Sequence, residues 1–364
     1  MKILTIVGAR PQFIKAAVLS RLIANDSSVN EIIVHTGQHY DSNMSEVFFE
    51  EMSIPRPLYN LHVKSKLHGE MTGKMIIEIE KIALKETPDC ILVYGDTNST
   101  IAGAFVAAKL GIKLAHVEAG LRSFNNSMPE EINRIVTDRL SDVLFCPTEN
   151  SVENLMREGF EYLKEKEIVR TGDIMLDASI YYSSINIQFS RKIPEKFILC
   201  TIHRAENTDN NTKLVTIFDS LNHIGKENPV VIPLHPRTKG KLEKIKPDYQ
   251  SIYENIYFLD PLSYFEMIWC LKNCIYVITD SGGLQKEAYF FKKMCLTLRD
   301  ETEWIELVDY GYNILSPIEK NEIINKANSI LNFKVDFDTK LYGDGNTGVT
   351  ILKSLKSILS QQDY

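Results

Sequence analysis

The sequence predicts an α/β protein of two doubly wound domains, each a parallel sheet covered by helices on both faces. Short apolar runs rich in β-branched residues alternate with helical patterns, which is typical of parallel strands joined by helices. The alternation occurs twice, on either side of a polar stretch at about 183–195. A length of 364 residues agrees with two domains, since one domain takes roughly 150 residues. With 44% hydrophobic and 24% charged residues, the chain can bury two cores.

The first series of runs predicts a domain over residues 1–182. Its expected strands are 3–7, 32–35, 90–94, 113–117 and 143–146. The second series predicts a domain over residues 183–364, with strands at 197–201, 230–234, 256–259, 276–279 and 295–298. A last helix is expected at about 350–360, because its apolar side chains recur at helical spacing and must pack on another part of the protein.

Charge and cysteine content restrict the class of protein. The net charge of -7, from 41 basic and 48 acidic residues, gives no general attraction for nucleic acid or for an anionic membrane surface. No apolar stretch reaches the roughly 20 residues that span a bilayer. The six cysteines lie mostly in apolar runs without a C-x-x-C pair, which predicts buried, reduced thiols and a cytoplasmic protein.

Polar residues gather directly after the predicted strands. In open parallel sheets, ligands bind outside the carboxyl ends of the strands, so these loops are the candidate binding edges. Two such edges that face each other would form a cleft between the domains. The loops begin at Gly8, Gly95, His116, His203, His235, Asp280 and Arg299.

The tripeptide Ser281-Gly282-Gly283 stands between a predicted strand and a helix. Backbone N–H groups at a helix start can bind phosphate, so the motif predicts a phosphate cradle. The alternative is a tight turn with Asp280 or Ser281 as the helix N-cap. Glu287, one turn into the helix, could accept both hydroxyls of a ribose, although a solvated surface glutamate is the simpler interpretation of that residue alone.

Basic residues lie near several of the same strand ends. Arg10 and Lys15 flank the start of the helix after the first strand, where they could face a diphosphate. His203-Arg204 and His235-Pro236-Arg237 repeat this placement in the second domain. Exposed cations are the alternative for any one cluster, but several clusters on one predicted edge favour an anion site.

Asp96, Glu118 and Glu130 form a candidate acidic set. A carboxylate at a buried strand end is costly without a partner, which favours a working site for Asp96 and Glu118. Glu130 has a structural alternative, because Ser127-Met128-Pro129-Glu130 fits a capping box before a helix. From the local pattern alone, the capping box is the preferred interpretation.

Three patterns are set aside. Gly343 to Gly348 spells G-x-G-x-x-G, yet too few residues follow it for a dinucleotide-binding unit. His35 and His39 are four residues apart, but Gly37 between them follows a strand end, so they are not expected on one helix face as a metal pair would be. Asp336-Phe337-Asp338 lies outside the strand pattern. We therefore expect neither a nicotinamide cofactor nor a metal.

Taken together and in their order along the chain, the motifs resemble those of non-hydrolysing UDP-N-acetylglucosamine 2-epimerases. The resemblance extends from Met1 to about Gly348. The motifs are Gly8-Ala9-Arg10-Pro11, Gly95-Asp96-Thr97, His116 to Arg122, Pro129-Glu130-Glu131, His203-Arg204, Asp280 to Gly283 and Tyr342 to Gly345. The resemblance implies a GT-B fold, in which two Rossmann-like domains face each other across a cleft and the terminal helix crosses back to the N-terminal domain. It also implies a cytoplasmic homodimer that makes activated sugars for bacterial surface polysaccharides.

The same resemblance implies a reaction without a cofactor. UDP-N-acetylglucosamine would be converted reversibly into UDP-N-acetylmannosamine by elimination and re-addition of UDP through a 2-acetamidoglucal. Asp96, Glu118 and Glu130 fall on the acid and base positions of the family, and His203 falls on its catalytic histidine. The implied substrate contacts are Arg10, Lys15, Arg134, His235, Ser281, Gly282, Gly283, Glu287, Arg299 and Glu303.

Departures from the family pattern leave the sugar open. Trp304-Ile305 replaces a common Arg-Pro, which resembles a subgroup that includes epimerases of UDP-2,3-diacetamido-glucuronic acid. Trp304 either contacts the sugar or packs beneath its loop. Met267 stands where an aromatic often stacks on uracil, so Tyr264 or Phe265 could replace it. UDP-N-acetylglucosamine is the first expectation. Other classes are a GT-B glycosyltransferase, a hydrolysing epimerase and a binding protein without turnover.

Overall fold

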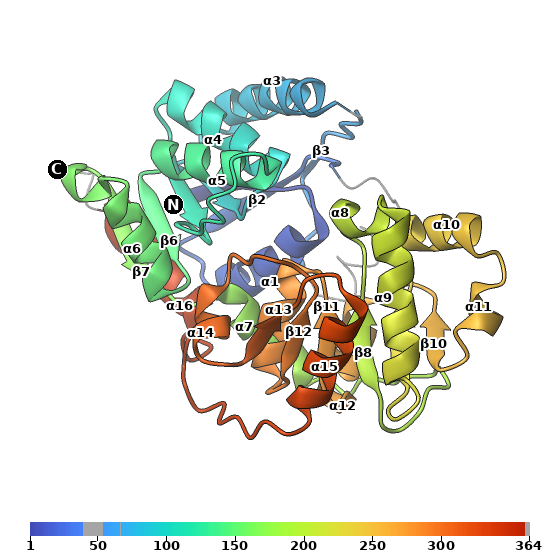
Figure 1. Ribbon diagram of the computed structural model, residues 1–364. Coiled ribbons are helices and arrows are strands. Elements are labelled where there is room, and N and C mark those ends of the chain that lie inside the picture. Colours follow the sequence, from blue (N-terminus) through green and yellow to red (C-terminus); the bar gives the residue numbers. More distant parts are fainter. Residues whose placement is uncertain (39–53, 66, 361–364) are drawn as a thin grey trace. The chain divides into compact units, whose positions relative to one another are not determined.

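The computed structural model describes residues 1–38, 54–65 and 67–360 (Figure 1). It divides into two compact units: residues 1–178 together with the segment from 340 onward, and residues 179–339. The sequence predicts a boundary at 182/183 and assigns residues 183–364 to the second domain, with the terminal helix packing toward the first. Helix α7 (Ile174–Ser183) runs through the junction between the units.

The first unit is built on a parallel sheet of seven described strands in the order β3-β2-β1-β4-β5-β6-β7. Two of them escape prediction, because β3 has only two residues and β7 is a polar edge strand without a buried residue. The strands are β1 (Lys2–Val7), β2 (Asn30–His35), β3 (Tyr59–Asn60), β4 (Cys90–Tyr94), β5 (Lys113–Val117), β6 (Val143–Cys146) and β7 (Glu167–Arg170).

Helices pack closely on this sheet. Helix α4 is buried along most of its length, and a Cβ on Gly103 would lie 2.9 Å from Val93 Cγ1, so glycine allows the close approach. The described helices of this unit, besides the start of α7, are α1 (Arg10–Ala24), α3 (His68–Glu86), α4 (Asn98–Leu110), α5 (Pro129–Leu140), α6 (Glu149–Arg157), the 3-10 helix η1 (Phe160–Tyr162) and α16 (Thr347–Ser360).

The final helix, α16, packs against α1 at the other end of the sequence. A Cβ on Gly348 would lie 2.7 Å from Val18 Cγ1, so the two helices are in close contact there. Asp177 of α7 accepts hydrogen bonds from Thr347 N and Gly348 N at 3.2 and 2.8 Å and thereby caps α16. The last helix therefore belongs to the first unit by packing.

The second unit holds a parallel sheet of six described strands in the order β10-β9-β8-β11-β12-β13. The strands are β8 (Ile198–Thr201), β9 (Val230–Pro233), β10 (Ile256–Leu259), β11 (Val277–Thr279), β12 (Cys295–Thr297) and β13 (Asn313–Leu315). The described helices are α8 (Ala205–Thr208), α9 (Asn211–Ile224), α10 (Pro236–Ile245), α11 (Tyr249–Ile252), α12 (Tyr264–Asn273), α13 (Gly282–Phe290), α14 (Ile305–Asp309) and α15 (Lys320–Ile330). The two predicted α/β sheets are thus confirmed, and β13 is an addition.

The predicted capping box before α5 is wrong. The helix begins at Pro129 with Met128 as its N-cap, and Met128 has no side-chain oxygen that could cap. Ser127 is one residue too early, and its N–H and hydroxyl donate instead to Asn125 Oδ1. The side chains that α5 buries are polar, while Ile132 and Ile135 of the expected apolar face are exposed.

Candidate active site

The predicted site residues lie after neighbouring strands in each sheet. In the first unit, Arg10, Asp96 and Glu118 follow β1, β4 and β5, which are adjacent in the order β1-β4-β5. In the second unit, His203 and Ser281 follow the adjacent strands β8 and β11. In each sheet the candidate residues therefore lie together at the carboxyl ends of neighbouring strands, where ligands bind in open parallel sheets.

Asp96 is held by α5. Gly95 turns the chain at the end of β4 with a φ of 62°. Arg134 Nη2 donates to Asp96 Oδ2 at 2.6 Å, and Asn133 Nδ2 donates to the Asp96 carbonyl at 2.9 Å. The Asp96 side chain is 27% exposed, whereas that of Arg134 is buried. The carboxylate is thus fixed in direction and still accessible.

Glu118 has an unusual backbone conformation and a cationic partner. Its φ is 75°, in the left-handed region that residues other than glycine rarely adopt. Such strain persists where surrounding contacts enforce it, and it clusters at functional sites. Lys15 Nζ lies 2.6 Å from Glu118 Oε1, and both side chains are nearly buried. Lys15, expected to contact substrate, therefore pairs with a candidate acid or base of the same unit.

Glu130 and Glu131 are adjacent and differ completely in environment. Glu130 is exposed on the first turn of α5. Glu131 is fully buried and accepts hydrogen bonds from Ser123 N and Oγ, Phe124 N and Arg134 Nη1 at 2.9 to 3.0 Å. Glu131 therefore holds the loop before α5 and the arginine that orients Asp96. Sequence reasoning missed this role, since the two residues look alike in the sequence.

His203 is oriented by Asp280, a buried residue that the sequence offers only as a possible helix cap. Asp280 accepts hydrogen bonds from His203 N, Arg204 N and Asn207 Nδ2, and its Oδ1 lies 3.2 Å from His203 Nδ1. Burial alone would raise the pKa of Asp280, but the hydrogen bond and charge of His203 hold that pKa below its ordinary value. The His203 side chain is 41% exposed, so one edge of the ring is anchored and the rest is accessible.

His235 lies beside His203, with their ring centroids 5.9 Å apart. It is the N-cap of α10, and its Nδ1 accepts a hydrogen bond from Arg237 N at 3.2 Å. Burial lowers the pKa of His235, and the charges of His203 and Arg237 lower it further. Arg237 itself forms an ion pair with Asp209.

The two glycines at the start of α13 have different surroundings. A Cβ on Gly282 would overlap Glu303 Oε1, and Glu303 is buried and paired with Arg299 at 2.9 Å. Among the described residues, no atom lies within 4 Å of a Cβ on Gly283. Gly282 is therefore explained by internal packing, whereas Gly283 leaves open space where a ligand could approach. Ser281 is the N-cap residue by position, but in the described chain no capping bond involves its side chain.

Gln285 fastens the loop after β12 to α13. Its Oε1 accepts hydrogen bonds from Thr302 Oγ1 at 2.7 Å and from Asn313 Nδ2 at 2.9 Å. In this loop Trp304 is only 3% exposed, with Lys286 Nζ 4.0 Å from its ring centroid. This geometry favours the alternative in which Trp304 packs beneath its loop.

The remaining predicted contacts are partly accessible. Arg10 is the first residue of α1, and Glu287 lies in the second turn of α13; both are half-buried. Of the aromatic alternatives to Met267, Tyr264 is buried against Tyr182, while Phe265 is half-buried, with its ring 5.4 Å from the same tyrosine. Phe265 is therefore the more accessible of the two.

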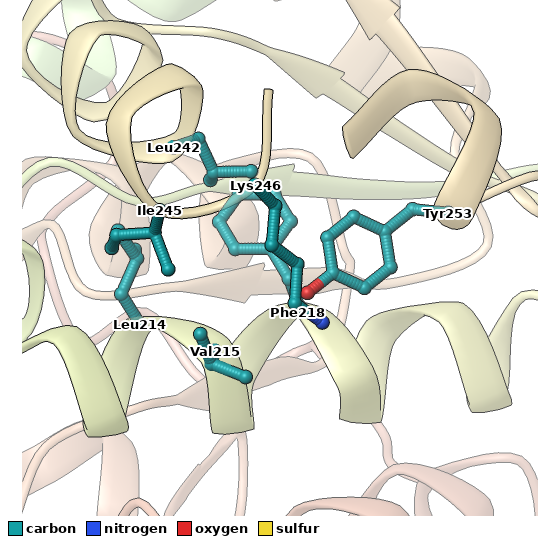
Figure 2. A pocket seen from close by; sticks show the side chains of 7 residues that line it. All are labelled: Leu214, Val215, Phe218, Leu242, Ile245, Lys246 and Tyr253. Atoms are coloured by element: carbon teal, nitrogen blue, oxygen red, sulfur yellow. The ribbon is translucent and has the colours of Figure 1, made fainter. Parts of the chain in front are cut away.

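One small hollow in the second unit lies away from these residues (Figure 2). Lys246 Nζ lies 4.9 Å from the ring centroid of Tyr253, whose hydroxyl donates to Asp219 Oδ1 at 3.0 Å. The lining side chains are Leu214, Val215, Phe218, Leu242, Ile245, Lys246 and Tyr253. Their contacts join α9, α10 and the segment after α11, and none of them is a predicted site residue.

Residues 1–38, 54–65 and 67–360 contain neither a metal-binding cluster nor a membrane-spanning helix. Over that part of the chain, no three His, Cys, Asp or Glu side chains are grouped to hold a metal ion. His39, half of the rejected histidine pair, lies outside the described residues. None of the described helices combines the length and apolar character needed to cross a bilayer.

The chain has two parallel-sheet α/β units whose candidate residues lie at the carboxyl ends of the strands. A family model described as UDP-N-acetylglucosamine 2-epimerase matches residues 21–356, and the chain belongs to this family. It is 50% identical to UDP-2,3-diacetamido-2,3-dideoxy-D-glucuronate 2-epimerase of Pseudomonas aeruginosa, over 98% of this chain and 100% of the relative. It is 41% identical to UDP-N-acetylglucosamine 2-epimerase of Methanocaldococcus jannaschii, over 98% of this chain and 99% of the relative.

Solved structures agree with this assignment. The crystal structure of the Methanocaldococcus jannaschii enzyme in complex with UDP-GlcNAc and UDP has a TM-score of 0.87 at 40% identity, covering 98% of this chain and all of that one. The enzyme from Neisseria meningitidis bound to UDP-GlcNAc has a TM-score of 0.86 at 28% identity, with the same coverage. The protein is thus an epimerase, as the sequence predicts.

Proposed function

We propose that the enzyme epimerises C2 of UDP-2,3-diacetamido-2,3-dideoxyglucuronate. The observation that carries this choice is the 50% identity to the Pseudomonas aeruginosa relative of that name, against 41% to the Methanocaldococcus jannaschii relative named for UDP-N-acetylglucosamine. From the sequence alone, UDP-N-acetylglucosamine is the first expectation and this substrate the second. We reverse that order because of the higher identity to the relative named for the diacetamido-glucuronate.

The proposed chemistry is elimination followed by re-addition. A carboxylate removes the proton from C2, the C2–H electron pair forms the C1–C2 double bond, and the C1–O bond breaks with its electrons leaving on UDP. The diphosphate then returns to the same face of C1 while a carboxylic acid delivers a proton to the opposite face of C2. No electrons are gained or lost overall, so the scheme requires no nicotinamide.

Asp96, Glu118 and Glu130 are the proposed acids and bases, with His203 beside the departing diphosphate. A positioned general acid or base contributes about 10²- to 10⁴-fold. Asp96 and His203 suit these roles, since each is held by a buried partner and keeps an accessible edge. Ser281, Gly283 and Arg10 are proposed to bind the diphosphate, and Glu287 the ribose.

A second candidate is the epimerisation of UDP-N-acetylglucosamine, favoured by the structural match to the enzyme complexed with UDP-GlcNAc. The two substrates differ at C3 and C6. A pocket built to pair a polar substituent rejects the analogue that lacks it by up to about 10⁴-fold. Measuring kcat/KM for both UDP-sugars therefore separates the candidates.

The test is incubation of each UDP-sugar in deuterated water without an acceptor, followed by NMR. We expect deuterium at C2 of the product and of recovered substrate, with the diacetamido-glucuronate turned over more efficiently. Asp96→Asn serves as the control and should exchange at least about 10²-fold more slowly. Turnover that leaves protium at C2 would exclude the mechanism, and higher kcat/KM on UDP-N-acetylglucosamine would restore the second candidate.

We further infer a cytoplasmic homodimer. The six cysteines are all buried and unpaired, which suits a reducing compartment. Light scattering should give a mass near twice the 41.6 kDa of the chain.

A further inference from the structure

A buried charge network lies behind Asp96 and Glu118. His116 and Asp138 are both completely buried, with His116 Nδ1 2.7 Å from Asp138 Oδ1. Arg122 Nη1 donates to Asp138 Oδ2 at 2.7 Å, and its Nε and Nη2 donate to the two oxygens of Glu158 at 2.6 and 2.8 Å. Glu158, one-third exposed, is the outer end of the network.

Both nitrogens of His116 face hydrogen-bond acceptors. Nε2 lies 2.7 Å from the Gly95 carbonyl oxygen, which can only accept, so Nε2 carries a proton. Nδ1 faces Asp138, whose other oxygen already accepts from Arg122 and from Gly120 N. Burial alone would raise the pKa of Asp138, but the hydrogen bond and charge of His116 and the charge of Arg122 keep that pKa below its ordinary value. The Arg122 guanidinium and Gly120 N both donate to Asp138 and stabilise its ionised carboxylate. Opposite an ionised Asp138, Nδ1 must donate as well.

The network connects the two loops that carry the proposed acids and bases. Gly95, held by His116, directly precedes Asp96. Gly120, held by Asp138 through its N–H and by Asn154 through its carbonyl, follows Glu118 by two residues. A Cβ on Gly120 would overlap Ser151 O, so this loop has little room to move. These contacts surround the left-handed backbone of Glu118.

We propose that His116 and Asp138 are a positioning pair for the reaction, with His116 protonated on both nitrogens. Neither residue touches the reactants. The pair fixes the Gly95 carbonyl and the 118–122 loop, and thereby the distance between Asp96 and Glu118. This proposal rests on the proposed catalytic roles of those two carboxylates. A displacement of about 1 Å in such groups can cost about 10²-fold in rate.

Nitrogen-15 NMR of the protein without substrate tests the protonation. We expect two N–H signals from His116, assigned by their loss in His116→Gln. In Asp138→Asn the amide can donate to Nδ1, so one of the two signals should disappear. A single protonated nitrogen in the wild-type protein would overturn the double-donor arrangement, even if neither UDP-sugar is turned over.

Steady-state kinetics tests the positioning role. His116→Gln puts an amide oxygen or a single donor where two donors stand, so we expect kcat to fall about 10²-fold with KM changed less than about threefold. Asp138→Asn keeps the bond to Gly95 and should lose about tenfold. Glu158→Gln is the matched control, because it weakens the same network at its outer end without touching His116.

The melting temperature of the wild-type protein and of each variant is measured first. The kcat values are then compared at temperatures equally far below the melting temperature of each protein. Glu158→Gln should keep kcat within about twofold of wild type even where its melting temperature falls. If Glu158→Gln loses as much kcat as His116→Gln, the network acts through stability alone and the proposal fails. An absence of turnover in the wild-type protein would instead refute the proposed function. The NMR result would then decide whether His116 donates from both nitrogens.

Discussion

Glu130 and Glu131 show how far the fates of adjacent residues can differ. Both are glutamates in the first turn of α5, where a negative charge is favourable. Glu130 is exposed, whereas Glu131 is enclosed by donors from Ser123, Phe124 and Arg134. The structure excludes the capping role for Glu130, which removes the local alternative to its proposed part in catalysis.

We predict that Glu130→Gln lowers kcat by about 10²-fold or more while the melting temperature stays unchanged. Among the described residues, no hydrogen bond or ion pair involves this exposed carboxylate, so the change should affect mainly the proposed proton transfer. Deuterium incorporation at C2 and differential scanning calorimetry measure the two effects.

Glu131→Gln is the matched control at the neighbouring position. It should lower the free energy of unfolding by about 1.5–3 kcal/mol, because hydrogen bonds to a buried charge are lost. A Glu130→Gln protein with normal turnover would remove Glu130 from the reaction.

At the scale of elements, the start of α13 is shaped by the loop after β12. Gln285 ties the two together through Thr302, and Glu303 lies directly against Gly282. The glycine pair that resembles a phosphate cradle therefore has two separate functions in the structure. Gly282 admits a carboxylate of the protein, and Gly283 is proposed to admit the ligand.

We predict opposite outcomes for alanine at these two glycines. Gly282→Ala should lower the free energy of unfolding by about 1–3 kcal/mol, since the new methyl group displaces buried Glu303. Gly283→Ala should leave stability unchanged and weaken UDP binding, measured by isothermal calorimetry. Unaltered UDP affinity in Gly283→Ala would show that the diphosphate does not approach this backbone.

At the scale of the whole molecule, buried thiols are distributed over both units. Cys90 and Cys146 lie in the first unit, and the second unit holds Cys200, Cys270, Cys274 and Cys295. Burial raises the pKa of Cys90, Cys270, Cys274 and Cys295 to about 12. Since the thiolate is the reactive form, all six should be inert in the native protein.

We predict that no cysteine is alkylated at neutral pH in the folded protein and that all six react in denaturant. During heating, mass spectrometry of the labelled peptides reports each unit separately. Labelling of Cys90 and Cys146 together with the other four would show that the units unfold in one step. Rapid labelling of any cysteine in the native state would contradict its burial.

The sequence predicts the strands best where both faces of the sheet are covered. The central strands β4, β5 and β6 have their predicted bounds, because central strands of a parallel sheet form continuous apolar runs. The edge strand β10 also has its predicted bounds, since its sequence is apolar throughout. Strands β3, β7 and β13 were missed, since edge strands are short or polar and form only when a neighbour offers hydrogen bonds.

For the site, the sequence by itself determined which residue types follow which strands, and the strand-end rule and the resemblance located Asp96, Glu118, His203 and the glycine pair. Only the tertiary structure decided their partners. Asp280 meets His203 across 77 residues, and Lys15 meets Glu118 across 103. Such pairs cannot be predicted from local sequence spacing. The ionisation state and orientation of a buried charged side chain depend on the group that packing brings within about 3 Å of it, and that group can be distant in the sequence.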